Sequence, residues 1–176
     1  MKTLDLGSGP NPRNPYLATE VFGIDVRSLN NQVREANLFI DPIPFPDNEF
    51  EFVTAFDFIE HVPRVLNVYD KILDKNIIIN PFINLMNEIY RILKDDGIFL
   101  SKTPAYPNTQ AFQDPTHINI ITEDTFPVYF NDHYPVAHIY GFNGGFKIKK
   151  QYWDTFYLVT ELIKSPKPDL SKFNSY

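Results

Sequence analysis

The stretch that decides the fold is Leu4-Asp5-Leu6-Gly7-Ser8-Gly9-Pro10, which is followed by Gly23-Ile24-Asp25-Val26. In the first half an apolar strand leads into a glycine loop, and in the second an apolar strand ends in a carboxylate. Parallel α/β sheets bind nucleosides at the carboxyl ends of such strands. Glycine lets the backbone approach a ligand closely, and an acidic residue about 20 positions beyond the first strand can hold a ribose diol. The sequence therefore predicts a nucleoside site.

Two classes of nucleoside cofactor compete for this site. A dinucleotide fingerprint requires G-x-G-x-x-G, and Pro12 stands at the third glycine position here. Pro10, Pro12 and Pro15 also oppose a regular helix directly after the strand, so a pyrophosphate at a helix N-terminus is poorly supported. A cofactor without phosphate is favoured, and a dehydrogenase is the less favoured alternative.

Further blocks follow in the order of a known family. They are residues 41–53 (DPIPFPDNEFEFV), 59–62 (IEHV), 88–100 (EIYRILKDDGIFL) and 114–117 (DPTH). With the glycine loop, these blocks resemble the class I S-adenosylmethionine-dependent methyltransferases over about residues 3–125. The resemblance is strongest to a branch with a Gly-Ser-Gly-Pro-Asn-Pro loop and a DPTH segment.

The resemblance implies a set of cofactor-binding residues at successive strand ends. They are Asp5, Gly7, Ser8 and Gly9 at the methionine moiety, Asp25 at the ribose with Val26 directly after it, Asn37 and Leu38 at the adenine, and Phe56 and Asp57 at the sulfonium. Asp25 could instead cap a helix that begins near Ser28, and Phe56 could simply fill the core. The cofactor that the resemblance implies is S-adenosyl-L-methionine.

His117 is the candidate catalytic residue, because it follows Asp114-Pro115-Thr116 on the loop where a substrate is expected to enter. As a general base it would take a proton from an alcohol acceptor. The alternative is that His117 only pins the loop by hydrogen bonds. His61, in the Glu60-His61 block, is as compatible with a structural role as with a functional one. No metal site is predicted, since His117 with Asp114 offers two ligands at a spacing common by chance.

Alternating strands and helices predict an α/β fold with a mostly parallel sheet. The resemblance implies a Rossmann-like three-layer sandwich with seven strands in the order 3-2-1-4-5-7-6. The last two predicted strands, 146–153 and 156–163, are too close in sequence for a parallel crossover and predict an antiparallel edge hairpin. Predicted helices cover 28–34, 58–73 (interrupted at Pro63), 81–96 and 123–130. We expect one domain over residues 1–164 and a flexible tail over 165–176.

The composition of the chain limits the classes of molecule that it is expected to bind. The net charge is −6 without a strongly basic face, so nucleic acid is not expected. No apolar run approaches the ~18 residues of a membrane span, and no signal peptide is recognised. The chain has no cysteine, which excludes disulfides and thiolate metal sites. We expect a cytoplasmic protein that acts on a small molecule. The exposed end of the first strand and the 15% aromatic content favour a homodimer.

The predicted activity is methyl transfer to a small hydroxylated acceptor, with a sugar or polysaccharide precursor as the first expectation. The alternative is a catalytically silent cofactor-binding or regulatory subunit with the same fold. Its support is that the family usually carries helices before the first strand, whereas the first strand predicted here begins at Lys2.

Overall fold

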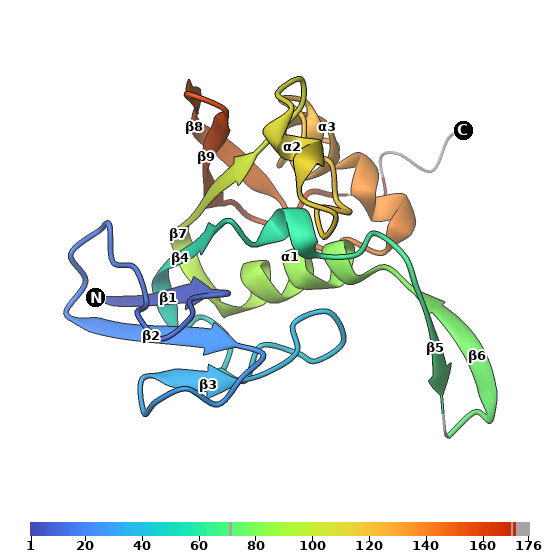
Figure 1. The fold of residues 1–176 in the computed structure, drawn as a ribbon. Coiled ribbons are helices and arrows are strands. Elements are labelled where there is room, and N and C mark those ends of the chain that lie inside the picture. Colours follow the sequence, from blue (N-terminus) through green and yellow to red (C-terminus); the bar gives the residue numbers. More distant parts are fainter. Residues whose placement is uncertain (71, 170, 172–176) are drawn as a thin grey trace.

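A computed structural model of the chain describes residues 1–70, 72–169 and 171 (Figure 1). The strands are β1 (Lys2–Leu6), β2 (Glu20–Asp25), β3 (Val33–Glu35), β4 (Phe50–Phe56), β5 (Leu66–Asp70), β6 (Lys75–Ile79), β7 (Leu93–Pro104), β8 (Phe146–Asp154) and β9 (Tyr157–Lys164). The helices are η1 (Ile59–His61), α1 (Pro81–Ile92), α2 (Gln110–Gln113), α3 (Thr125–Tyr129) and η2 (Val136–Tyr140).

Seven strands form one sheet in the order β3-β2-β1-β4-β7-β9-β8. The pairs from β3 to β7 are parallel, whereas β9 pairs antiparallel with both β7 and β8. The labels differ from the expected 3-2-1-4-5-7-6 because β5 and β6 form a separate two-stranded hairpin. Numbered within the large sheet alone, its strands run in the expected order. The predicted α/β class, parallel sheet and antiparallel edge pair are confirmed.

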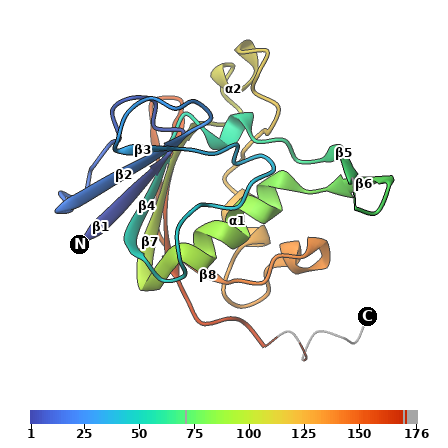
Figure 2. The same cartoon turned by 90° about the horizontal axis from the view of Figure 1, so that it is seen from below.

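The core lies between this sheet and α1. Side chains from the central strands, among them Leu4, Val53 and Phe99, pack in one cluster with Met86 and Ile89 of α1. Figure 2 shows the sheet nearly edge-on with α1 on one side of it. Burial of these apolar side chains is the main favourable contribution to the stability of the fold.

On the second face of the sheet, the structure differs from the predicted layer of helices. Among the described residues, the connections from β1 to β2, from β2 to β3 and from β3 to β4 contain no helix. The three prolines after β1 oppose helix formation there, and the loop instead stacks Tyr16 on Phe52 with ring centroids 4.3 Å apart. Irregular chain therefore covers the part of the sheet around Phe52.

Two predicted helices are wrong. Residues 28–34 form a turn followed by the start of β3, so Asp25 does not cap a helix there. The described part of 58–73 holds only the short η1 and then the extended β5. Figures 1 and 2 show the β5–β6 hairpin standing away from the body of the molecule.

Half of the predicted flexible tail, residues 170 and 172–176, lies outside the described residues. Its first residue is held by the body of the fold. Ser165 N donates to Gly145 O at 3.0 Å, and Ser165 O accepts from the Tyr90 hydroxyl at 2.8 Å.

Candidate functional site

The glycine loop leaves β1 in a conformation that needs glycine twice. Gly7 and Gly9 have φ values of 65° and 57°, in the left-handed region that favours glycine. A Cβ on Gly7 would overlap the ring of Phe58, whereas a Cβ on Gly9 would meet no atom within 4 Å. Ser8 N donates to Ile24 O at 3.0 Å, which ties the loop to β2. The loop is thus held on one side and open beside Gly9.

Asp25, the last residue of β2, contacts the glycine loop from the neighbouring strand. Its side chain is largely buried, and Oδ2 accepts from Gly9 N at 3.1 Å. Oδ1 accepts from Arg27 Nε at 2.8 Å and from Arg27 N at 3.1 Å. The Arg27 guanidinium lowers the pKa of the Asp25 carboxyl, with the backbone amides adding to the effect. Asp25 is therefore a carboxylate at neutral pH that touches the glycine loop directly.

Asp5 is 2% exposed and holds the loop from beneath. Its Oδ2 accepts from Arg13 N at 2.8 Å, and Oδ1 accepts from the Thr54 hydroxyl on β4 at 2.7 Å. Burial raises the pKa of the carboxyl, although both hydrogen bonds act in the opposite direction. With both oxygens engaged by the chain itself, Asp5 anchors the Pro-rich segment to the centre of the sheet.

Phe56 ends β4 at the same edge of the sheet, and Asp57 follows it directly. The Arg13 guanidinium lies 4.7 Å from the centre of the Phe56 ring, and its Nη2 is 3.8 Å from Asp57 Oδ2. Asp57 has a φ of 49° and an exposed side chain. Phe56 is only half-buried, so its ring is not simple core. Sequence reasoning missed Arg13, for which the available signal was a basic residue four positions after Gly9.

The three other predicted cofactor-binding residues lie at the ends of β2 and β3. Val26 is 61% exposed directly after Asp25. Asn37 follows β3 by two residues, and its side-chain oxygen accepts from Phe39 N at 3.2 Å. Leu38 is buried in the core cluster. The structure brings Asp25 into contact with the glycine loop, whereas Asn37 is engaged in its own turn.

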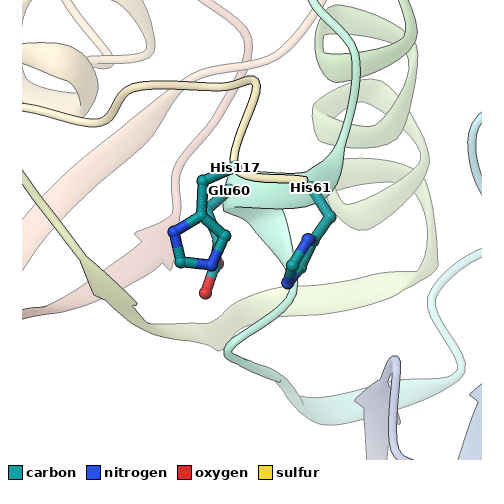
Figure 3. A group of neighbouring side chains, drawn as sticks. All are labelled: Glu60, His61 and His117. Carbon is teal, nitrogen blue, oxygen red and sulfur yellow. The ribbon is translucent and has the colours of Figure 1, made fainter. Parts of the chain in front are cut away.

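A second group of side chains gathers beyond the carboxyl ends of β4 and β7. Glu60 and His61 lie in η1, and His117 comes from the loop after α2 (Figure 3). One potential ligand atom from each of the three lies within 4.8 Å of the others. The His61 and His117 rings meet edge to face, with centroids 4.8 Å apart. Sequence reasoning singled out each of these blocks and did not predict that they meet.

Backbone hydrogen bonds hold the two segments together. Ile118 N and Asn119 N both donate to Glu60 O, at 3.0 and 2.9 Å, and Asn119 Nδ2 donates to Ile59 O at 2.9 Å. Within the loop, Thr116 donates to Asp114 Oδ1 through its N at 2.8 Å and its hydroxyl at 2.7 Å. These bonds lower the pKa of the Asp114 carboxyl. Asp114 therefore shapes the turn that carries His117.

Both histidines use Nδ1 toward a backbone carbonyl. His117 Nδ1 is 3.1 Å from Gln110 O, and His61 Nδ1 is 3.2 Å from Thr116 O. A carbonyl oxygen only accepts, so Nδ1 carries the hydrogen in each neutral ring and Nε2 keeps its lone pair. His117 is therefore competent as a base through Nε2. Burial raises the pKa of the neighbouring Glu60 carboxyl.

The family of the chain follows from comparison of its sequence with family profiles. The profile described as methyltransferase domain matches residues 1–133. The chain belongs to the methyltransferase-domain family. Its matched region contains the glycine loop, Asp25, Glu60, His61 and His117. Among curated proteins, no sequence matches the chain.

Solved structures share the fold of this methyltransferase domain at low sequence identity. A SAM-dependent methyltransferase from Aquifex aeolicus has a TM-score of 0.56 and 15% identity, with 93% of this chain and 81% of that chain covered. The [4+2]-cyclase SpnF has a TM-score of 0.58 and 15% identity, with 93% and 74% covered. YcgJ from Bacillus subtilis has a TM-score of 0.53 and 17% identity, with 86% and 64% covered. The chain thus spans just under two thirds of YcgJ, and the cyclase illustrates that one fold hosts different reactions.

Membrane insertion through a helix has no support in the described residues. None of their helices is long and apolar enough to cross a bilayer.

Proposed function

We propose that this methyltransferase domain transfers a methyl group from S-adenosyl-L-methionine to a small hydroxylated acceptor, such as a sugar or polysaccharide precursor. The observation that carries the proposal is the contact between the Asp25 carboxylate and Gly9 N beside an open space. A carboxylate next to a glycine backbone at the ends of two parallel strands suits a ribose diol. The branch with the Gly-Ser-Gly-Pro-Asn-Pro loop and the DPTH segment belongs to this proposal.

The residues around the open space fit the parts of the cofactor. Asp25 would accept hydrogen bonds from the two ribose hydroxyls, and Gly7, Ser8 and Gly9 would lie along the methionine moiety. When bound, S-adenosylmethionine supplies a methyl group activated by its sulfonium. The Phe56 ring would face that cation, which an aromatic face attracts. Because its own oxygens are engaged, Asp5 would act by positioning the loop.

The adenine end is proposed for Val26, Asn37 and Leu38. Asn37 would turn its amide oxygen from Phe39 N to the adenine amino group, and exposed Val26 would pack on the ring. Arg13 joins the proposed site at the opposite end. Its guanidinium, next to Asp57 and Phe56, is placed to pair with the methionine carboxylate.

For an alcohol acceptor, the chain must receive one proton as the methyl group is transferred. We propose that His117 receives it at Nε2, since Nδ1 is committed to Gln110 O. Well-oriented reactants can supply roughly 7–11 kcal/mol of barrier reduction, so positioning by the surrounding loop is expected to contribute more than the base.

The test separates cofactor classes first and activity second. Thermal unfolding is measured with S-adenosylmethionine, S-adenosylhomocysteine and NAD, each at the same concentration. Stabilisation by the first two and not by NAD supports the proposal, and stabilisation by NAD alone contradicts it. Transfer of labelled methyl to a panel of sugars then distinguishes an enzyme from a silent cofactor-binding subunit.

We also propose that the chain forms a homodimer through the β5–β6 hairpin. An isolated two-stranded hairpin is marginally stable in water. Large apolar side chains are exposed on its strands, at Tyr69 and Ile78, and in its turn, at Ile72 and Leu73. A second copy would cover them. Light scattering on the full chain and on Ile78→Lys tests this, with a dimer expected for the first and a monomer for the second.

A further inference from the structure

The strongest unexplained feature is a buried carboxylate oxygen. Glu60 is 1% exposed, and its Oε1 has no hydrogen-bond partner among the described residues. Its other oxygen, Oε2, accepts from the Thr103 hydroxyl at 2.8 Å. A buried carboxylate without a partner is costly unless a cation or a donor compensates it or the group takes up a proton. Oε1 therefore points to a ligand that the chain itself does not supply.

The neighbours of the Glu60 carboxylate are the imidazoles of His61 and His117, and His117 Nε2 also lies 3.8 Å from Asp114 Oδ2. In both His61 and His117, Nδ1–H donates to a backbone carbonyl. Metal-binding histidines use this arrangement almost always, because the carbonyl fixes the tautomer and the orientation of the ring. Figure 3 shows the Glu60, His61 and His117 side chains gathered around one small region.

The spacing suits a small cation. The three potential ligand atoms lie within 4.8 Å of one another. Around a tetrahedral zinc ion, ligand atoms at about 2.1 Å from the metal are roughly 3.4 Å apart. Side-chain movements of about an ångström would close the difference. The Asn119 and Glu60 backbone bonds hold the two segments in register for such a closure.

We propose that Glu60, His61 and His117 bind a divalent transition-metal ion of the zinc class, with a fourth position open to water or an acceptor oxygen. Two imidazole nitrogens and one carboxylate oxygen match catalytic zinc sites, which keep three protein ligands and one open position. Magnesium and calcium prefer sets made of oxygen only and are not expected to bind here. The second part, an acceptor oxygen at the open position, rests on the proposed methyl transfer. With Nε2 on the metal, His117 could not also act as the general base, and the acceptor hydroxyl, made more acidic by the ion, would lose its proton to water.

The test is calorimetric titration of the chelator-treated full chain with Zn²⁺ and separately with Mg²⁺, without cofactor or acceptor. One Zn²⁺ per chain and no Mg²⁺ binding are expected. His61→Ala, His117→Ala and Glu60→Gln should each weaken Zn²⁺ binding by at least about tenfold, since even changes to residues behind the ligands cost 10–100-fold. His133→Ala is the matched control, because His133 is exposed and outside the cluster, and it should bind as the native chain does.

A second measurement keeps the test valid if a variant folds poorly. Thermal unfolding with and without Zn²⁺ should show a rise in Tm for the native chain and for His133→Ala, and none for Glu60→Gln. Glu60→Gln keeps the side-chain shape while removing the buried charge, so it should fold without metal. Absence of Zn²⁺ binding by the native chain, or equal binding by the native chain and the three site variants, overturns the metal site. Neither measurement uses S-adenosylmethionine. Failure of the metal proposal therefore leaves the proposed methyl transfer untouched.

Discussion

The Asp25 carboxylate already accepts hydrogen bonds from groups within the chain, and the charged donor among them is the Arg27 guanidinium. The Arg27 Nε–Asp25 Oδ1 distance is 2.8 Å, and Nη2 lies 3.3 Å from Oδ2. Ribose hydroxyls at the proposed site would need the same lone pairs. The Arg27 side chain, which is exposed, would therefore compete with the cofactor and would have to swing away.

Arg27→Ala should consequently bind S-adenosylhomocysteine more tightly, by up to about fivefold, the range expected when an exposed ion pair no longer has to be broken. Titration calorimetry measures the effect. Lys75→Ala, which removes the same charge from the β5–β6 hairpin, serves as the control and should leave the affinity unchanged. Weaker binding by Arg27→Ala would mean that the guanidinium contacts the ligand rather than competing with it.

Substitution of His117 distinguishes a catalytic role from a role in anchoring the loop. The His117 side chain is 10% exposed and is fixed through Nδ1 to Gln110 O. His117→Ala should lower turnover by about 10²–10⁴-fold with the affinity for S-adenosylhomocysteine unchanged, as expected for loss of a general base. The same fall is expected if Nε2 holds a metal, and the Zn²⁺ titration tells these roles apart. A variant that loses stability and acceptor affinity, with normal turnover at saturating acceptor, assigns His117 to anchoring alone.

At the scale of secondary-structure elements, the Glu51 side chain links three neighbouring strands of the sheet. At the start of β4 it accepts from Lys2 N on β1 at 2.6 Å and from Lys94 Nζ on β7 at 2.6 Å. The Lys94 ammonium and the Lys2 amide lower the pKa of Glu51 to about 2 from an ordinary value of 4.5. A carboxyl with a depressed folded-state pKa stabilises the fold above its unfolded pKa and loses that contribution as the pH falls toward its folded pKa.

Glu51→Gln should therefore reduce the free energy of unfolding by about 1 kcal/mol at pH 7, a value that allows for the partial exposure of the pair. The difference from the native chain should shrink as the pH falls from 4.5 toward 2. Urea unfolding at several pH values measures it, with Glu35→Gln on exposed β3 as the control. A difference that stays constant from pH 7 to pH 3 would show that the ionised Glu51 carboxylate does not stabilise the fold through Lys2 and Lys94.

The elements differ in how well their sequences predicted them. Asn80-Pro81 and the helical spacing of Leu85, Ile89 and Ile92 predicted α1, although the Asn80 side chain makes no capping bond and the helix ends at Ile92 rather than near Asp96. β5 lies within the segment 58–73 that was predicted as helix, and no strand was predicted at β6. Pro63 and the β-branched run Ile77–Ile79 favoured strands there, and the alternating burial of β5 follows a period of two.

The site was predictable where one strand end carries its own signal. Gly7, Gly9 and Asp25 are each read from a local pattern, and the Gly9–Asp25 contact follows from parallel pairing of β1 with β2. The meeting of Glu60 with His117 was not predictable, because it depends on how a long loop folds back on η1. The same holds for Arg13 over Phe56, since no local pattern fixes the course of the Pro-rich loop.

At the scale of the whole molecule, one edge of the sheet collects every candidate group. The glycine loop after β1, Asp25 at the end of β2, Phe56 at the end of β4 and Glu60 in η1 all follow parallel strands that point the same way. Parallel α/β sheets bind ligands at this edge. The proposed cofactor site and the histidine cluster therefore lie at the same edge of the sheet, as the proposed methyl transfer requires.

The central claim is that this edge binds S-adenosylmethionine through Asp25, and calorimetric titration with S-adenosylhomocysteine tests it most directly. The native chain should bind one molecule. Asp25→Ala, checked for folding by thermal unfolding, should weaken binding by about 1.5–3 kcal/mol, or roughly 10- to 150-fold. Asp124→Ala, which removes a carboxylate before α3, should bind as the native chain does. No binding by the native chain, or equal binding by a folded Asp25→Ala variant, would contradict the account.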